Sequence, residues 1–297
     1  MRIIVAGDSL GLPRPHRINN YSVNEYDLAV SYNETYPSII NKELLTYFKM
    51  NPFIEVINKS KRSQTIAGIY SEFIDILFFH QPDIIVLQIG IVDCWFREEL
   101  NGGQHVPRKE YEEYLKKILS YLQYRPRCKL IIVGICPTSS KMQGRYPKIN
   151  NEIKQYNKIL KDKVDHKSVF YVNMEKHVNL KNIHQYLLQD DHHLNKKGNK
   201  LVATELLKII KGIIYTNQGA EIEDKMNFKL MSEYFEKAFD MYPYNLDTVY
   251  NLLISLYEIK EYEKLIVVIR TIIDNNMIDI EIQNLIQIIT SNLNNMD

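Results

Sequence analysis

The 297-residue chain has little cysteine and little net charge. Its three cysteines, Cys94, Cys128 and Cys136, do not have the spacing of a metal site. An odd and sparse count also excludes a disulfide framework and indicates reduced thiols. No secretory signal pattern follows Met1, and no apolar run approaches the length of a membrane span. We therefore expect a cytoplasmic protein with no membrane span.

The formal net charge is only +1 at pH 7. A protein that binds the phosphate backbone of nucleic acid normally concentrates basic residues on one face. The basic run over 58–62 is too short to form such a face. We expect no nucleic-acid partner. The apolar fraction of 45% is sufficient for a sizeable core, and the length fits one large or two medium domains.

Short apolar runs alternate with segments of helical periodicity over the first two-thirds of the chain. Buried parallel strands have this composition, and helices form the crossover connections between them. The expected strands are 2–6, 53–57, 84–89, 130–135 and 169–172, and the expected helices are 36–48, 65–79, 109–122, 146–164 and 196–215. The pattern predicts an α/β domain with a parallel five-stranded sheet and helices on both faces.

Two connections are longer or more irregular than a simple crossover needs. Residues 11–32, rich in Asn, Tyr, Pro and Arg, leave the sheet directly after the first expected strand. Long connections in compact domains are often functional, so this one is a candidate lid over the substrate. Residues 138–147, with Ser, Gly and Pro, are a second candidate for the rim of a site.

Two segments carry the residue types of a hydrolytic site. Gly7–Leu10 (Gly-Asp-Ser-Leu) follows the first strand, and Asp190–Asn195 (Asp-Asp-His-His-Leu-Asn) precedes the last helix of the α/β region. Ser9 would lie at a strand's carboxyl end, where open α/β sheets bind ligands. A serine becomes a nucleophile when an imidazole takes its proton and a carboxylate orients that imidazole. His193 and Asp190 suit these roles, with the imidazole titrating in the neutral range.

Some of these residues also suit roles outside catalysis. Asp190 and Asp191 fit the N-cap of the following helix. Asp190 and His193 are chemically able to bind a metal, but no second dense cluster of His and Asp completes a shell, so we expect neither metal nor cofactor. Trp95, the only tryptophan, either stacks on a sugar ring or packs beneath a loop.

At the Gly-Asp-Ser-Leu and Asp-x-x-His blocks the chain resembles the SGNH hydrolase superfamily, also called GDSL esterases. In that family these two blocks supply the catalytic triad, which the resemblance places on Ser9, His193 and Asp190. It implies a flavodoxin-like three-layer α/β/α fold and the activity of a carboxylic ester hydrolase. An O-acyltransferase would use the same triad.

Two other blocks depart from the family pattern. Its third block, Gly-x-Asn-Asp, reads Gly90–Asp93 (Gly-Ile-Val-Asp) here, so Val92 replaces an asparagine that donates into the oxyanion hole. Loss of one such donor commonly costs a rate factor of about 10²–10³. In the second block Ser63 replaces a glycine, and the resemblance implies an oxyanion hole built from the amides of Ser9 and Ser63. Val92 also leaves open a catalytically weak module that binds a glycan or an anion.

The substrate is expected to touch loop residues around the triad. Arginines in these loops would suit an anionic substrate and would offer a replacement for the lost donor. The residues proposed to bind substrate are Arg14, Arg62, Asp93, Trp95 and Arg97. The Gly-Ile-Val-Asp-Cys stretch, with 33–37, resembles a subset associated with surface-polysaccharide gene clusters, which implies an O-acylated carbohydrate or polysaccharide precursor.

The composition changes after the α/β region. We expect a hydrolase domain over 1–215, a linker over 216–225 and a small all-helical domain over 226–297. Residues 233–245 and 250–272 resemble parts of tetratricopeptide repeats, with bulkier residues at 253 and 265 than is usual. A plain helical bundle is the alternative. Because so short a unit needs a packing partner, we expect a protein partner or self-association through 226–297.

Overall fold

The computed structural model describes residues 1–15, 28–48, 54–222, 224 and 226–294. Five parallel strands form one sheet in the order β4-β1-β5-β8-β9. They are β1 (Arg2–Gly7), β4 (Glu55–Asn58), β5 (Ile84–Gln88), β8 (Lys129–Val133) and β9 (Val169–Val172). The predicted α/β class and the five-stranded parallel sheet are confirmed.

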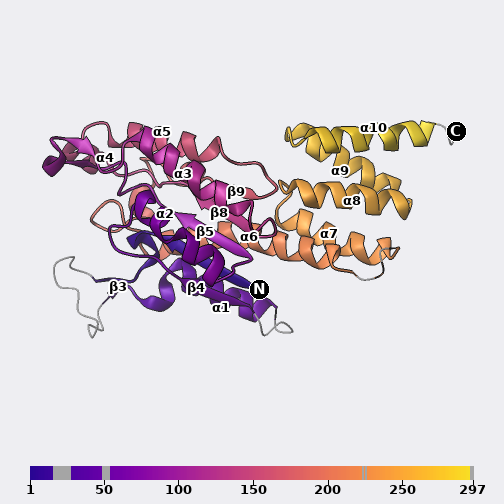
Figure 1. The fold of residues 1–297 in the computed structure, drawn as a ribbon, viewed down its shortest axis with the longest axis horizontal. Coiled ribbons are helices and arrows are strands. Elements are labelled where there is room, and N and C mark those ends of the chain that lie inside the picture. The colour runs from indigo at the N-terminus through magenta and orange to yellow at the C-terminus, as the bar shows by residue number, and fades with distance from the viewer. Residues whose placement is uncertain (16–27, 49–53, 223, 225, 295–297) are drawn as a thin grey trace. The chain divides into compact units, whose positions relative to one another are not determined.

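Helices cover both faces of the sheet. They are α1 (Tyr36–Tyr47), α2 (Ile66–Ile74) with its π-helical extension η3 (Asp75–Phe79), α3 (Arg108–Leu122), α5 (Ile149–Lys161) and α6 (Lys196–Ala220). Figure 1 shows α3 and α5 on one side of the strands and α1 on the other. Right-handed crossovers require this arrangement, because the chain steps from β1 to β4 in one direction and then returns past β1 to β5. The result is the three-layer order of the flavodoxin-like fold.

The remaining elements are short. They are the antiparallel ribbon of β2 (Arg14–Pro15) with β3 (Leu28–Val30), the ribbon of β6 (Phe96–Arg97) with β7 (Gly103–Gln104), helix α4 (Ser140–Arg145), and the 3-10 turns η1 (Ser9–Gly11), η2 (Tyr32–Glu34), η4 (Glu98–Leu100), η5 (Met174–Lys176) and η6 (Ile183–Gln185). The candidate lid over 11–32 thus begins and ends in the β2–β3 ribbon, while its centre, 16–27, lies outside the described residues. The candidate rim loop, 138–147, contains α4.

The strand sequences explain where the functional edge lies. Every residue of β5 and all of β1 except Arg2 are buried, as expected for strands covered on both faces. The strand order reverses between β1 and β5, so their carboxyl ends flank a topological switch point. Ser9 follows β1, and the turn at 90–94 follows β5. Both segments therefore meet at the edge where such folds bind ligands.

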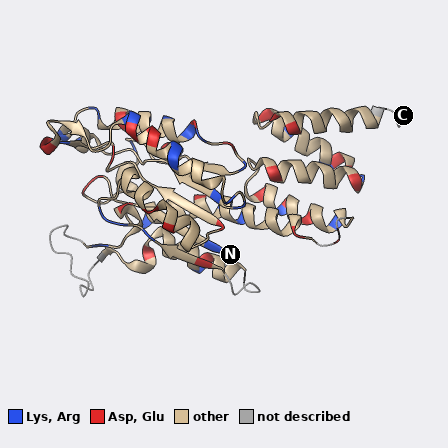
Figure 2. Cartoon of the chain, in the orientation of Figure 1, with Lys and Arg blue, Asp and Glu red and all other residues tan. Residues whose placement is uncertain are grey.

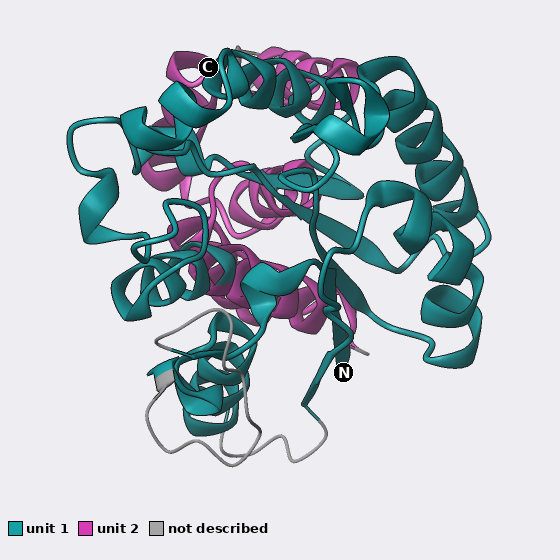
Figure 3. Cartoon of the chain, turned by 90° about the vertical axis from the view of Figure 1, so that its left-hand side faces the viewer, with its two compact units in different colours: residues 1–206 teal, residues 207–297 magenta. Residues whose placement is uncertain are grey.

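The chain divides into two compact units, residues 1–206 and 207–297 (Figure 3). The second unit contains the end of α6 and four further helices, α7 (Phe228–Met241), α8 (Leu246–Glu258), α9 (Tyr262–Asp274) and α10 (Ile280–Asn294). Helix α8 packs against α7, α9 and α10 around Phe235, Leu252 and Leu256. The predicted all-helical C-terminal region is confirmed.

Helix α6 does not end where the sequence pattern places its stop. It continues from Tyr215 to Ala220, through the first half of the expected linker. Gly219 looks like a helix terminator, but a Cβ there would lie 2.8 Å from Cε1 of Phe235, so the glycine serves close packing within the second unit. Thr216 also contacts Thr248, with 2.6 Å between their hydroxyl oxygens. The domain limits 1–215, 216–225 and 226–297 stay a prediction.

Two surface properties bear on partners. Figure 2 shows acidic and basic residues interspersed along the helices, in keeping with the near-zero net charge. Among the described helices, none is both long enough and apolar enough to cross a bilayer.

Candidate active site

Ser9 is held at the carboxyl end of β1 by the turn that follows the strand. The amide of Asp8 donates to the carbonyl of Gln88 at 3.1 Å, and Asp8 Oδ1 accepts from the amide of Leu10 at 2.9 Å. A Cβ on Gly7 would lie 2.7 Å from the Gln88 carbonyl oxygen, so only glycine lets the two chains approach this closely. Asp8 therefore caps η1 and fixes Ser9 beside the end of β5.

The Asp190–Asn195 segment forms a tight turn before α6. Asp191 has a φ of 65°, in the left-handed region that aspartate tolerates better than most residues. Asp190 Oδ1 accepts from the amide of His193 at 2.9 Å, and the His193 carbonyl accepts from the amide of Leu188 at 2.7 Å. These bonds orient the Asp190 and His193 side chains toward each other.

The structure brings Ser9, His193 and Asp190 into one hydrogen-bonded chain. Ser9 Oγ lies 2.9 Å from His193 Nε2, and His193 Nδ1 lies 2.6 Å from Asp190 Oδ2. A carboxylate accepts a hydrogen bond from Nδ1–H, so this contact selects the tautomer whose Nε2 carries no proton and can accept a hydrogen bond from Ser9. The order of groups is that of a Ser-His-Asp triad.

Burial sets the ionisation of the pair. It lowers the pKa of His193 to about 4; the hydrogen bond to Asp190 opposes this shift, and the charges of His192 and Arg14 add to it. Burial by itself would raise the pKa of Asp190, but the hydrogen bond and charge of His193 outweigh it and lower that pKa. At neutral pH the site therefore holds a carboxylate and a neutral imidazole. We expected His193 to titrate in the neutral range, as a solvated imidazole does. Its pKa is lower because the ring is buried.

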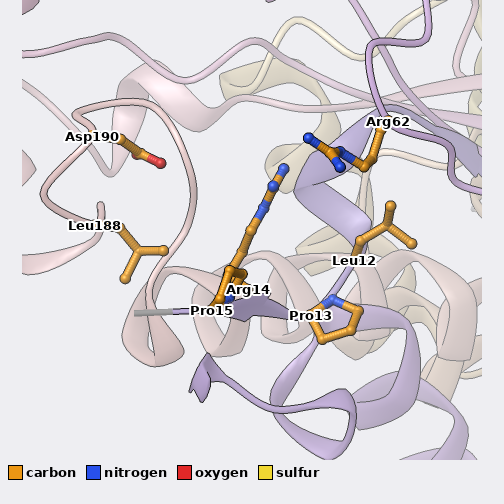
Figure 4. A pocket seen from close by; sticks show the side chains of 7 residues that line it. All are labelled: Leu12, Pro13, Arg14, Pro15, Arg62, Leu188 and Asp190. Atoms are coloured by element: carbon orange, nitrogen blue, oxygen red, sulfur yellow. The ribbon is translucent and has the colours of Figure 1, made fainter. Parts of the chain in front are cut away.

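Arg14 is a fourth side chain at the base. Its Nη2 contacts His193 Nε2 and also donates to the backbone carbonyl of Ser9 at 3.1 Å. Beside it lies a cavity of about 240 Å³ (Figure 4). The cavity is lined by Leu12, Pro13, Arg14, Pro15, Arg62, Leu188 and Asp190. Two of the three predicted arginines thus share one cavity beside the triad.

The other predicted substrate residues lie elsewhere. The Arg97 guanidinium is 5.0 Å from the centre of the Trp95 ring, and Trp95 packs edge-on against His192 at 4.9 Å between ring centres. The ring centres of His192 and His193 are 4.0 Å apart. His192 therefore lies between Trp95 and the His193 ring. Asp93 is fully buried and accepts from the amide of Ile66 at 2.9 Å, at the start of α2. The structure brings neither Arg97 nor Asp93 to the wall of the cavity.

Among the described residues, the candidate oxyanion hole contains backbone donors only. Ser63 has a φ of 54°, so it adopts the left-handed conformation that favours glycine. Within the described part of the chain, the amides of Ser9 and Ser63 donate no hydrogen bond, which leaves both free to bind an oxyanion. Val92 is buried and has no donor. The third block therefore supplies no side-chain hydrogen bond.

The sequence pattern did not identify Asn199, which forms hydrogen bonds to the turn that carries His193. This buried residue of α6 accepts from the amide of Tyr36 at 2.9 Å and donates to the carbonyls of Leu194 and Asn195. It links α1 to the turn that carries His193. The signal that would have found it is a polar residue on the inward face of an amphipathic helix.

Comparison with known proteins settles the family. A profile of the GDSL-like lipase/acylhydrolase family matches residues 20–201, a range that includes Asp190 and His193 and begins after Ser9. The chain belongs to this family. The resemblance inferred from the two blocks is thereby confirmed, and so is the serine hydrolase class that it implies.

The relatives of this GDSL-family chain share its fold more than its sequence. A GDSL esterase/lipase of Arabidopsis thaliana is 34% identical over 71 residues, which are 24% of this chain and only 30% of that protein. An acetylxylan esterase from Geobacillus stearothermophilus is 19% identical, with a TM-score of 0.52, over 70% of this chain and 92% of that one. A lipase/acylhydrolase from Enterococcus faecalis is 18% identical, with a TM-score of 0.53, over 71% and 96%. The structural matches show the fold.

A metal would compete with the triad for the same atoms. Among the described residues, Asp190, His192 and His193 form the one group of side chains that could hold a metal ion, with possible ligand atoms within 4.8 Å of one another. Both ring nitrogens of His193 already contact Asp190 and Ser9. Binding a metal there requires breaking one of these contacts. The geometry of this GDSL-family site favours the hydrogen-bonded triad over a metal centre.

The lowered pKa of His193 predicts an unusual pH profile for this GDSL-family enzyme. A general base must be unprotonated, so kcat/KM should fall only as the pH drops through about 4, and should be nearly constant from mildly acidic to neutral pH. Initial rates with an aryl acetate across that range measure this, with far-UV circular dichroism at each pH to exclude unfolding. An acid limb near the ordinary imidazole pKa of about 6.5 would contradict the burial argument.

Proposed function

We propose that this chain is an esterase that removes an acyl group from an O-acylated carbohydrate or polysaccharide precursor, with Ser9 as nucleophile, His193 as base and Asp190 as its orienting carboxylate. The observation that carries the proposal is the hydrogen-bonded chain from Ser9 Oγ through His193 to Asp190, at 2.9 and 2.6 Å. Its members come from opposite ends of the α/β domain. Only the fold brings them together, in the geometry that nucleophilic catalysis needs.

The reaction follows from these contacts. Ser9 Oγ attacks the ester carbonyl while its proton passes to His193 Nε2, and the carbonyl electrons move to the oxygen. The tetrahedral intermediate collapses, the sugar oxygen leaves, and it takes the proton from Nε2. Water then attacks the acyl-enzyme, gives its proton to Nε2, and the released acid leaves Ser9 to recover that proton. In each step Asp190 stabilises the transient imidazolium.

The amides of Ser9 and Ser63 are proposed to bind the oxyanion, with no metal or cofactor. Backbone donors suit this role because they are fixed before the reaction begins. Ser63 supports it by adopting the left-handed backbone conformation that favours glycine. Val92 offers no third donor, so we expect slower turnover than a site with asparagine there.

The carbohydrate substrate rests on two kinds of support. Similar folds include an acetylxylan esterase, and solved structures of that protein include catalytic mutants in which a serine or a histidine is replaced by alanine. In this chain Arg14 and Arg62 supply hydrogen-bond donors beside the triad. The Arg97 guanidinium lies over the Trp95 ring, and Trp95 is half-buried. Both observations favour a packing role for Trp95 over stacking on a sugar ring. The buried free thiols of Cys94, Cys128 and Cys136 support a cytoplasmic location.

Two further functions use the same observations. An O-acyltransferase would replace water by a sugar hydroxyl in the second step, with the same triad. A weak glycan- or anion-binding module is favoured by Val92 and by the arginines of the cavity. For the second unit we propose a protein partner or a second copy, because Val267, Ile280 and Ile288 are more than half exposed on α9 and α10.

Covalent labelling tests the proposed function. A fluorophosphonate bonds to serine Oγ and loses fluoride only where the hydroxyl is activated, so incubation at neutral pH should place one phosphonyl group on the peptide that contains Ser9. Tryptic mass spectrometry locates the adduct, and the Ser9→Ala protein is the control. Failure to label Ser9, in protein shown to be folded by circular dichroism, would favour the binding module.

A further inference from the structure

Arg14 lies where it opposes the proposed proton transfer from Ser9 to His193. It contacts Nε2 of His193, the atom that must accept the proton of Ser9. A guanidinium stays protonated at every pH that the protein meets, so it cannot accept that proton. It also places a positive charge against an imidazole that must itself become positive in the transition state. The base is therefore held by a cation that has to move, or be neutralised, before catalysis.

The cavity beside the triad offers a counter-charge site. Arg62 lines the same cavity and makes no hydrogen bond or ion pair within the described part of the chain. Figure 4 shows the Arg14 side chain extending from β2 toward Arg62, whose guanidinium is turned toward it. The one carboxylate in the lining, Asp190, already accepts from His193 and from the amide of His192. Among the described residues, two cations thus face the cavity, and the single carboxylate of its lining is already hydrogen-bonded.

We propose that the substrate is an O-acylated sugar that carries an anionic group, carboxylate or phosphate, and that this group binds between Arg14 and Arg62 and draws Arg14 away from His193. The proposal rests on the proposed esterase function and adds the charge of its substrate. Arg14 then has two positions. In contact with His193 it slows turnover of a neutral substrate, and in contact with the anion it orients the acidic one.

The fit is chemical as well as electrostatic. A guanidinium presents a planar fork of N–H donors that matches the paired oxygens of carboxylate or phosphate. The other described residues of the cavity wall are leucines and prolines, whose apolar side chains suit the carbon face of a sugar ring. A volume of about 240 Å³ has room for one monosaccharide unit rather than a long chain.

Three matched esters test the proposal on the wild-type protein. Methyl 2,3,4-tri-O-acetyl-glucoside is neutral, the corresponding glucuronide carries a carboxylate at carbon 6, and the glucoside 6-phosphate carries a phosphate there. All three offer the same acetyl esters, and released acetate measures kcat/KM. We expect one or both anionic esters to exceed the neutral ester by about 10- to 100-fold in kcat/KM, the range of one hydrogen bond to a charged group. The better of the two identifies the anion.

Substitutions of Arg14 and Arg62 distinguish the effect of Arg14 on His193 from its binding of the anion. Arg14→Met removes the charge and the donors at similar length, so it should abolish the preference for the anion and raise turnover of the neutral ester. Arg62→Met should weaken the preference without raising neutral turnover. Lys61→Met is the control, because Lys61 is the adjacent cation but pairs with Glu72 and does not line the cavity. It should leave the preference unchanged.

Each outcome is decisive. Equal kcat/KM for the neutral and anionic esters in the wild type, with hydrolysis that depends on Ser9, overturns the inference and leaves the esterase intact. Equal loss of all three activities in Arg14→Met also overturns it, because Arg14 would then be an oxyanion donor. Ser9-independent hydrolysis, or none together with an unlabelled Ser9, overturns the proposed function and this inference with it.

Discussion

Replacing either Ser9 or His193 by alanine should lower kcat for a short-chain aryl acetate by about 10⁴- to 10⁶-fold, and the double variant should be no slower than either single variant. The nucleophile cannot be activated without the base, and the base has no proton to take without the nucleophile. The 2.9 Å contact between Ser9 Oγ and His193 Nε2 makes them one unit. Their losses are therefore shared rather than additive.

Matched control variants test whether the loss of kcat is specific to Ser9 and His193. Ser120→Ala and His184→Ala make the same chemical changes at exposed positions away from the site, and both should retain the wild-type kcat. Thermal unfolding of each variant shows whether the fold is kept. If the double variant were slower than the wild type by the product of the two separate effects, Ser9 and His193 would act independently, which would contradict the proposed triad.

Sequence reasoning succeeds here where the signal is local. The central strands β1 and β5 are almost entirely apolar because both of their faces are buried, and such runs can be recognised without a structure. The Asp-x-x-His spacing is equally local, since a turn over four residues is enough to join Asp190 to His193. Placing Ser9 beside them required the order of strands, which the family resemblance supplied.

What sequence reasoning misses depends on contacts distant in the chain. The lowered pKa of His193 is caused by its burial in the folded protein, so a motif alone assigns the imidazole its solvated pKa. The extension of α6 past Tyr215 follows from Gly219 packing on Phe235, which a helix-stop pattern does not reveal. The sequence did not distinguish the three arginines from one another. In the folded chain Arg14 contacts His193, whereas Arg97 lies over the Trp95 ring.

Asp190→Asn should separate an orienting carboxylate from a simple turn cap. Asparagine is nearly isosteric, so its oxygen still accepts from the amide of His193, as Oδ1 of Asp190 does at 2.9 Å. Its other group is an NH₂, which donates. Facing Nδ1, it favours the tautomer with the proton on Nε2, and that proton points at both Ser9 and Arg14. The base then has no lone pair for the serine, and kcat should fall by about 10³- to 10⁴-fold.

The adjacent Asp191 provides the matched control for this variant. Asp191→Asn makes the same change one residue away, at a φ of 65° that asparagine adopts as readily as aspartate. It should keep kcat within about threefold of the wild type, since surface changes of this kind shift free energies by only a few tenths of a kcal/mol. Steady-state rates with the aryl acetate compare the two variants, and their melting temperatures reveal any shared loss of turn stability. If Asp190→Asn and Asp191→Asn lose the same small fraction of activity, Asp190 only caps the turn, and His193 would need no carboxylate to act as a base. A loss confined to Asp190→Asn, at an unchanged melting temperature, would instead assign the defect to the imidazole tautomer.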